Sequence, residues 1–291
     1  MTDERIGTMD LCRKDGVSFL RFHEWSGLTG FSHAFSTREG GVSEGYFSSM
    51  NLSYYLGDRE ENVDENYRRF CAAAGFRTEK LVSGAQVHET RIREVGLTDC
   101  GQGVTDRSVR EEADGLCTNV PGVTLVTYHA DCVPLYFIDP VRKCIALSHA
   151  GWRGTVANIA GITVETLRSR YGSRPEDLIA GIGPCICKDC YEVDETVAEK
   201  ARLLPIGLSG ILFEKGNGKY LFDLARCNRD LMIRAGMDAD RITLGGVCTM
   251  CRGDLLYSHR GTGGKRGVHG AFLRIDESSP NGNERKEGKT Q

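Results

Sequence analysis

The sequence predicts a layered α/β fold of the α+β kind, in which a mixed β-sheet is flanked by helices. Two observations support this fold class: stretches with the three-and-four apolar spacing of helices interleave with short runs rich in β-branched and aromatic residues. Mixed elements of this length bury their apolar faces best by stacking helices on a sheet. Because no repeat or linker divides the chain, we expect one domain over residues 1–276.

Three segments have helical spacing. Residues 60–74 carry apolar side chains on one face and are followed by Gly75, a typical helix stop. Residues 155–171 are closed by Gly172, and Thr155 is the expected cap. A third helix is expected over residues 222–235.

Strands are predicted around these helices. The runs VTLVTY, VPLYFI and CIALSH follow one another with turn residues between them, so they suggest a sheet core. LIAGIG is a further strand, and strand character returns over residues 242–247, 255–258 and 267–275.

Composition narrows the function classes. With 37 Lys and Arg against 40 Asp and Glu, the net charge of −3 gives no positive field for nucleic acid. The apolar runs are too short for a membrane span, and the charged N-terminus lacks a signal-peptide core, so we expect a cytoplasmic protein. The 12 cysteines are then expected to be reduced. Residues 277–291 have little to bury and predict a disordered tail.

Three separate segments offer metal ligands: AQVHET at His88, HADCVP at Cys132 and SHAGWRG at His149. Imidazole and thiolate suit zinc, and three protein ligands leave a fourth position open, as in catalytic sites. Cys132 precedes VPLYFI and His149 ends CIALSH, so the two ligands meet at one sheet end if those strands are adjacent and antiparallel.

The residues alone leave this assignment open. A cysteine is often a small buried hydrophobe, and a histidine at a strand end is often only hydrogen-bonded. Four other histidines compete as ligands: His33, His129, His259 and His269.

A long string, ADGLCTNVPGVTLVTYHADCVPLYFIDPVRKCIALSHAGWRGT, resembles the signature of the YfiH/LACC1 family, also called the laccase-domain or multicopper polyphenol oxidase family. The similarity extends to FSTREGGVSEGYFSSMNLS, QVHET, GIGPCI, CYEV, CTMC, YSHRG and GKRG, over roughly residues 31–270. Two departures stand out: Glu89 follows QVH where the family usually has Gly, and His129 stands in HADC where many members have Thr.

The resemblance implies a cytoplasmic α/β enzyme whose zinc ligands are His88, Cys132 and His149. It implies phosphorolysis of adenosine, inosine, guanosine and methylthioadenosine, and deamination of adenosine to inosine. Its partners would be purine nucleosides and phosphate, and the oligomeric state stays open.

Deamination needs an activated water, which zinc supplies by lowering the pKa of a water it binds. A carboxylate must carry the proton, and Asp131, Glu192 and Glu89 are candidates.

Phosphorolysis needs cations that hold phosphate. Arg38 and Arg153 are the main candidates, Arg260 is a third, and Asn51 would support the loop that carries Arg38. A structural ion pair is the commoner fate of an arginine. Trp152 could stack on the base or pack in the core.

Other functions compete with this one. A copper-dependent polyphenol oxidase (Cu²⁺ in place of zinc) would need more histidines than the 7 in the chain. A metal-free hydrolase could use Cys132 as nucleophile and His149 as base, and a non-catalytic scaffold would need neither.

The segments CICKDC and CTMC could form a second thiolate site. Ordinary reduced thiols are the simpler interpretation of these cysteines.

Overall fold

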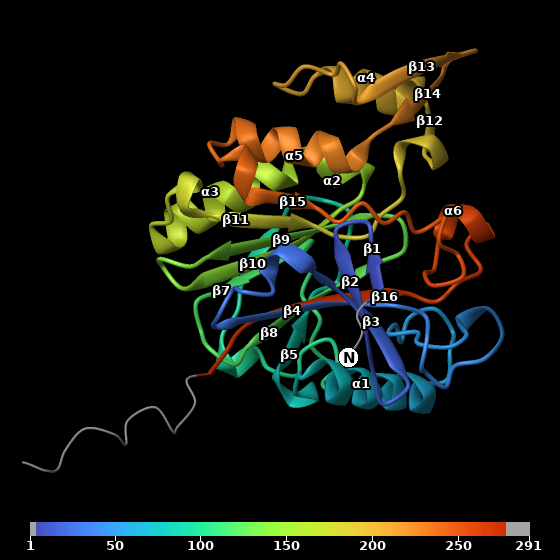
Figure 1. The fold of residues 1–291 in the computed structure, drawn as a ribbon, viewed down its shortest axis with the longest axis vertical. Helices are drawn as coiled ribbons and strands as arrows, with labels where there is room; N and C mark the ends of the chain where they lie inside the picture. The colour runs from blue at the N-terminus through green and yellow to red at the C-terminus, as the bar shows by residue number, and fades with distance from the viewer. Residues whose placement is uncertain (1–3, 278–291) are drawn as a thin grey trace, which may run out of the picture.

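Two large sheets stack face to face and helices cover both outer faces, as the computed structural model shows (Figure 1). The structure describes residues 4–277, so the tail predicted over residues 277–291 lies, apart from Glu277, outside the described residues. This layering of helices on sheets confirms the fold class expected from the sequence, although the core contains two large sheets and not one.

The first sheet has seven strands in the order β1-β2-β3-β4-β16-β8-β5. Its neighbours pair antiparallel except β5 and β8, which are parallel. The strands are β1 (Glu4–Ile6), β2 (Met9–Lys14), β3 (Val17–Phe22), β4 (Phe31–Ser36), β16 (His269–Ile275), β8 (Thr124–His129) and β5 (Leu81–Ser83).

The second sheet has six strands in the order β15-β11-β9-β10-β7-β6. Its two central strands, β9 and β10, pair antiparallel along their whole length. The strands are β15 (Ile242–Leu244), β11 (Ile179–Ile182), β9 (Val133–Asp139), β10 (Cys144–Ala150), β7 (Gly115–Thr118) and β6 (Ile92–Glu94).

Every residue of β9 and β10 is buried because both faces of this sheet are covered. Successive side chains point to opposite faces, so Leu135 and Phe137 pack under the helices while Tyr136 and Ile138 pack between the sheets. This explains why VPLYFI is a continuous apolar run and does not alternate with polar residues.

Helices lie on the outer faces of the two sheets (Figure 1). Helix α1 (Glu60–Ala74) covers the seven-stranded sheet, and helices α2 (Trp152–Val156), α3 (Ile159–Tyr171) and α5 (Leu224–Arg234) cover the six-stranded sheet. Helix α4 (Glu195–Arg202) lies farther out, beside a small sheet of β12 (Glu192–Asp194), β14 (Lys219–Phe222) and β13 (Leu212–Gly216). The short helix α6 (His259–Thr262) directly precedes the loop to β16. Within residues 4–277, no helix is long and apolar enough to cross a membrane.

Some predicted elements are confirmed and others are corrected. Helix α1 has the predicted bounds, with Gly75 in the left-handed conformation at its end. The predicted helix over residues 155–171 is two helices, because Asn158 has a φ of 62° and caps α3 through its side chain. The cap assigned to Thr155 is therefore wrong, and Gly151 precedes α2 instead. The strand predicted over residues 255–258 is a loop whose side chains are buried without a ladder.

Candidate metal centre

Three segments bring His88, Cys132 and His149 together. His88 lies on the loop after β5, Cys132 in the turn between β8 and β9, and His149 near the end of β10. Their ligand atoms all lie within 4.8 Å of one another. The condition for Cys132 and His149 to meet, that β9 and β10 are adjacent and antiparallel, is fulfilled, since His149 stands opposite Pro134, two residues after Cys132.

The turn that carries Cys132 leads from one sheet to the other, because β8 belongs to the seven-stranded sheet and β9 to the six-stranded one. Asp131 in this turn has a φ of 86°, and His88 has a φ of 64°. Such left-handed conformations are uncommon for side chains other than glycine and concentrate at functional sites. The backbone is thus bent sharply at two of the three ligand segments.

Asp114 holds the ligands in place, and the sequence analysis missed it. This carboxylate is fully buried, directly before β7, and lies 3.2 Å from His149 Nδ1. It also accepts hydrogen bonds from the backbone amides of Val87, His88 and Glu89. Because Nδ1 of His149 faces Asp114, its Nε2 is the nitrogen left for a metal. A carboxylate that orients a ligating histidine is a common feature of metal sites.

The charges at the site favour a thiolate. Burial would raise the pKa of Cys132, but His149 and His88 outweigh burial and lower that pKa to about 6. Burial would likewise lower the pKa of His149, and the Cys132 thiolate together with Asp114 raises it to about 9. Burial opposes a charged Asp114, whose pKa is nevertheless lowered by hydrogen bonds from His149 and from backbone amides. Cys132 is therefore prepared as an anionic ligand or nucleophile.

Gly151 leaves room for the three ligands. A Cβ atom at this position would lie 3.0 Å from His88 Cδ2 and 3.2 Å from Cys132 Sγ. A side chain here would therefore push on two ligands at once. His88 is exposed whereas His149 is buried, so the cluster opens to solvent on the His88 side.

The other histidines named as competitors have different surroundings. His33 accepts a hydrogen bond from the Phe22 amide, and His269 from the Tyr257 amide, each inside the core. His129 is hydrogen-bonded to Thr127 and to the carbonyl of Cys132. His259 is near Arg266. In residues 4–277, none of these histidines joins the ligand cluster.

The arginines predicted to hold phosphate differ in how many hydrogen bonds their guanidinium groups already make inside the protein. Arg38 donates to the carbonyls of Ser48 and Gly253, so it ties two loops together. Arg260 donates to the carbonyl of Glu192 and lies over the Tyr191 ring. Their role in phosphate binding stays a prediction.

Arg153 is exposed and stacks on Trp152 at 4.4 Å. Within the described part of the chain its side chain makes no hydrogen bond or ion pair, so its guanidinium is available to a ligand. Trp152 is only partly buried and packs against the core below the helices. Whether Arg153 contacts phosphate stays a prediction.

Asn51 is buried and its amide is used inside the protein. Its nitrogen donates to Ser53 and Asp58, and its oxygen accepts from the amides of Ser53 and Val268. Asn51 therefore braces the loop after Arg38, and its part in substrate or phosphate binding stays a prediction.

The three candidate carboxylates also differ. Asp131 is buried and accepts hydrogen bonds from the Thr249 hydroxyl and the Arg260 amide. Glu192 forms an ion pair with Lys215. Glu89 is exposed beside His88, and in residues 4–277 its carboxylate has no ion-pair partner.

A basic cavity of about 260 Å³ is lined by Arg38, Lys265 and Arg266 among others, and by none of the three ligands. Burial lowers the pKa of Arg266, and the opposite charges of Asp131 and Cys132 raise it in part, which places Arg266 within electrostatic reach of both. The sequence analysis missed Arg266, although it lies in the GKRG motif.

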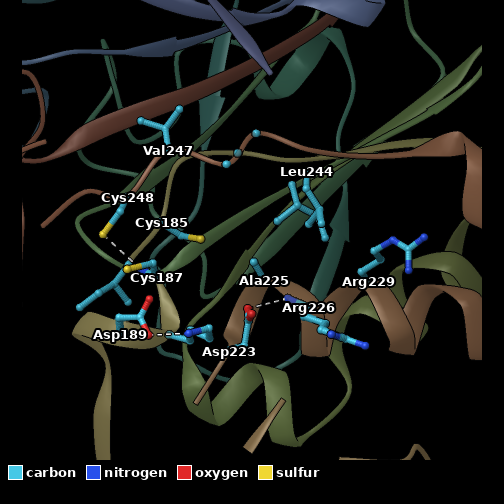
Figure 2. Close-up of a pocket in the computed structure, with 16 residues that line it drawn as sticks. Cys185, Cys187, Asp189, Asp223, Ala225, Arg226, Arg229, Leu244, Val247 and Cys248 are labelled. Carbon is cyan, nitrogen blue, oxygen red and sulfur yellow. Dashed lines mark hydrogen bonds and ion pairs between the residues drawn. The ribbon is translucent and has the colours of Figure 1, made fainter. Parts of the chain in front are cut away.

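A larger cavity of about 540 Å³ lies elsewhere, between the ends of β11 and β15 and the start of α5 (Figure 2). Its lining includes Cys187, Cys248 and Arg226 but none of the three ligands. This cavity therefore does not belong to the His88–Cys132–His149 cluster.

Two imidazoles and one thiolate, oriented by a buried carboxylate and open on one side, form a donor set that fits one divalent metal ion. The fold and the cluster thus define a layered α/β protein with a candidate mononuclear metal site where two sheets meet. The family described as "Multi-copper polyphenol oxidoreductase laccase" matches residues 32–276, and the chain belongs to this family.

Named relatives and a solved structure agree with this assignment. "Purine nucleoside phosphorylase YlmD" of Bacillus subtilis is 34% identical, over 84% of this chain and 88% of that protein. "Adenosine deaminase RL5" of an unknown prokaryotic organism is 32% identical, over 79% and 88%. The crystal structure of YlmD from Geobacillus stearothermophilus superposes with a TM-score of 0.86 at 34% identity, covering 92% of this chain and 99% of that one.

Proposed function

We propose that this protein is a zinc-dependent purine nucleoside phosphorylase that also deaminates adenosine. Its substrates would be adenosine, inosine, guanosine and methylthioadenosine. The cluster of His88, Cys132 and His149, open on one side, carries the proposal. The names of the relatives support it, since they are a purine nucleoside phosphorylase and an adenosine deaminase.

Zinc, when bound, would supply a Lewis acid that lowers the pKa of a bound water molecule from its ordinary value towards about 7. The chain's own part is to hold the ligands: Asp114 fixes the ring of His149 and, through the amides, the loop of His88. Glu89, exposed beside His88, takes the role of proton carrier in deamination.

Phosphate would enter the basic cavity lined by Arg38, Lys265 and Arg266. Cations at this place offset the charge of the entering phosphate while positive charge develops on the sugar. Burial raises the pKa of Tyr191, and the charges of Arg153 and Arg260 both oppose that rise, so the two guanidinium groups act on the same ring. These two arginines would close the nucleoside side of the site.

A cytoplasmic location is part of this proposal. The cysteines in residues 4–277 form no disulfide, and a thiolate ligand must stay reduced to bind metal.

The test is incubation of the purified protein with adenosine, with and without phosphate, followed by chromatography of adenine, inosine and hypoxanthine. We expect phosphate-dependent adenine and phosphate-independent inosine, both lost in Cys132→Ala. Cys100→Ala is the matched control, because Cys100 is a half-buried thiol outside the site. Glu89→Gln should lower deamination by about 10²-fold and phosphorolysis less. Zinc-loaded protein that forms no product would refute the proposal.

A second candidate is a metal-free cysteine hydrolase, favoured by one observation: Cys132, His149 and Asp114 lie in the order of a nucleophile, a base and an orienting carboxylate. It predicts that no zinc is bound at His88, Cys132 and His149, and that Cys132 is alkylated stoichiometrically at neutral pH. A copper oxidase has less support, because the ligand clusters within residues 4–277 contain two histidines in total.

A further inference from the structure

Four cysteines outside the candidate site lie close together. Cys187 and Cys190 form one C-x2-C pair after β11, and Cys248 and Cys251 form a second pair after β15. All four sulfur atoms lie within 4.8 Å of one another, and Cys190 and Cys251 are 3.5 Å apart. We propose that these four thiols bind a second zinc ion, as a closed structural site.

The distances fit four ligands around one ion. Zinc–sulfur bonds of about 2.3 Å in a tetrahedron place the sulfur atoms about 3.8 Å apart. A disulfide would need about 2.05 Å, so the pair of Cys190 and Cys251 is unbonded. The structure therefore has the spacing of a metal site and not that of a crosslink.

The backbone prepares the two pairs for a metal. The amides of Cys187 and Cys251 both donate to the sulfur of Cys248, at 3.3 and 3.4 Å (the first is drawn in Figure 2). Such bonds stabilise a thiolate and are typical of the surroundings of metal ligands. Each pair also turns tightly, through the bonds from Cys190 N to Cys187 O and from Arg252 N to Cys248 O.

The two turns are held side by side independently of any metal. Cys185 and Cys248 form a parallel bridge, in which the Cys185 amide donates to Val247 and the Thr249 amide donates to Cys185. Cys185 itself is buried and is not part of the cluster. The CICKDC segment thus supplies two ligands and one core residue.

Packing does not account for these thiols. A cysteine that serves as a small hydrophobe is buried, as are Cys71, Cys117 and Cys144 in the core. Cys251 is exposed, and Cys187, Cys190 and Cys248 are only half-buried. The simpler interpretation from sequence, ordinary reduced thiols, leaves unexplained why four of them converge near the surface.

Four thiolates favour zinc in a closed tetrahedron, with no position left for water or substrate. The site is therefore structural. It would join two loops that are 58 positions apart, from Cys190 to Cys248. Thr249, inside the second pair, donates its hydroxyl to Asp131 at 2.7 Å, and Asp131 directly precedes the ligand Cys132. The zinc ion at the four thiols would thus stabilise, through Thr249 and Asp131, the turn that carries Cys132.

The experiment is elemental analysis of the full chain purified under reducing conditions. We expect two zinc ions per chain in the natural protein and one in the double variant Cys190→Ser with Cys251→Ser. His149→Ala should also retain one, the ion at the four thiols. Cobalt substitution of His149→Ala should then give the strong thiolate-to-cobalt absorption of a four-sulfur site, and Cys100→Ser is the matched control with both ions.

A second measurement stays informative if the double variant fails to fold. Native protein is alkylated before and after chelation, and the modified cysteines are located by peptide mass spectrometry. We expect Cys251 and Cys190 to be protected until the chelator removes zinc. A zinc content that is the same in the double variant as in the natural protein, iron in place of zinc, or a protein mass that shows disulfides among the four cysteines would each overturn the proposal. The outcome is independent of whether the protein acts on nucleosides.

Discussion

The two cysteine-containing clusters are built in different ways. His88 and Cys132 come from two loops and His149 from the end of a strand, so they meet only because two sheets pack together, and a buried carboxylate orients them. Cys187, Cys190, Cys248 and Cys251 come from two tight turns whose own amides point at the sulfur. The first cluster has both nitrogen and sulfur donors and one open side, as catalytic metal sites do. The second has four sulfur donors that enclose the ion, as structural sites do.

The largest expected effect separates the two clusters by function. His149→Ala removes one ligand and the positive partner of Cys132, so we expect turnover of adenosine to fall by at least about 10³-fold. Cys190→Ser with Cys251→Ser should lower the melting temperature more than His149→Ala does. Activity assays and calorimetry on both variants check this. If the two variants behaved alike in both assays, the division of roles would be wrong.

The next effect tests the carboxylate that only the first cluster has. Asp114→Asn keeps the size of the side chain but removes the charge that orients His149, so we expect metal affinity at this cluster to fall by about 10–100-fold. Competition with a chelating dye measures it. Asp139→Asn is the matched control, because Asp139 is equally buried at the far end of β9. Equal losses in both variants would show that Asp114 acts only through folding.

A smaller effect concerns the room around the ligands. Gly151→Ala places a methyl group against His88 and Cys132, and overpacking of about 1–3 kcal/mol at such contacts should weaken metal binding by about tenfold. The four-thiol cluster should keep its affinity, as the same dye titration would show. Gly27→Ala is the control, since a Cβ there meets no neighbour within 4 Å. Unchanged binding in Gly151→Ala would mean that the ligands can move apart freely.

The smallest effect uses a histidine that belongs to neither cluster. Burial lowers the pKa of His33 to about 3, helped by the charge of Arg21. Between pH 6.5 and pH 3 the unfolded chain therefore binds the proton that the folded chain does not, so the free energy of unfolding falls as pH falls. His33 should contribute up to about 1.4 kcal/mol per pH unit to this slope.

Urea unfolding of His33→Gln at several pH values measures that contribution. Glutamine can still accept the hydrogen bond from Phe22, so the slope and not the fold should change. An unaltered slope in His33→Gln would contradict the assignment of a neutral buried imidazole.

Local patterns in the sequence predicted what depends on local physics. The periodicity of residues 60–74 and the glycine after them gave α1 with its bounds. The meeting of Cys132 and His149 depends, in the sequence analysis, on VPLYFI and CIALSH being antiparallel neighbours, and they are, so both residues lie at one end of the pair. This pairing can be inferred locally, because the two runs follow one another in the sequence with only turn residues between them.

Long-range packing could not be predicted in the same way. VTLVTY looks like the third strand of the same sheet, but β8 pairs with β16 and β5, which are distant in sequence. Asp114 looks like an ordinary charged residue before a strand until His149 and the His88 loop are folded against it. Leu255, Leu256 and Tyr257 look like a strand because they are apolar, yet they are buried by a loop that packs on the core.

The turn of Cys132, which leads from one sheet to the other, has a thermodynamic consequence. An ion bound there joins the chain at the corner of the sandwich, so the two sheets cannot separate without releasing it. Metal that binds only the folded chain stabilises it by RT ln(1 + [M]/Kd), which is about 2.7 kcal/mol at a hundredfold excess over Kd. The melting temperature of this protein should therefore rise with the concentration of free metal. Thermal unfolding of the whole fold then measures how far the metal site at Cys132 is occupied.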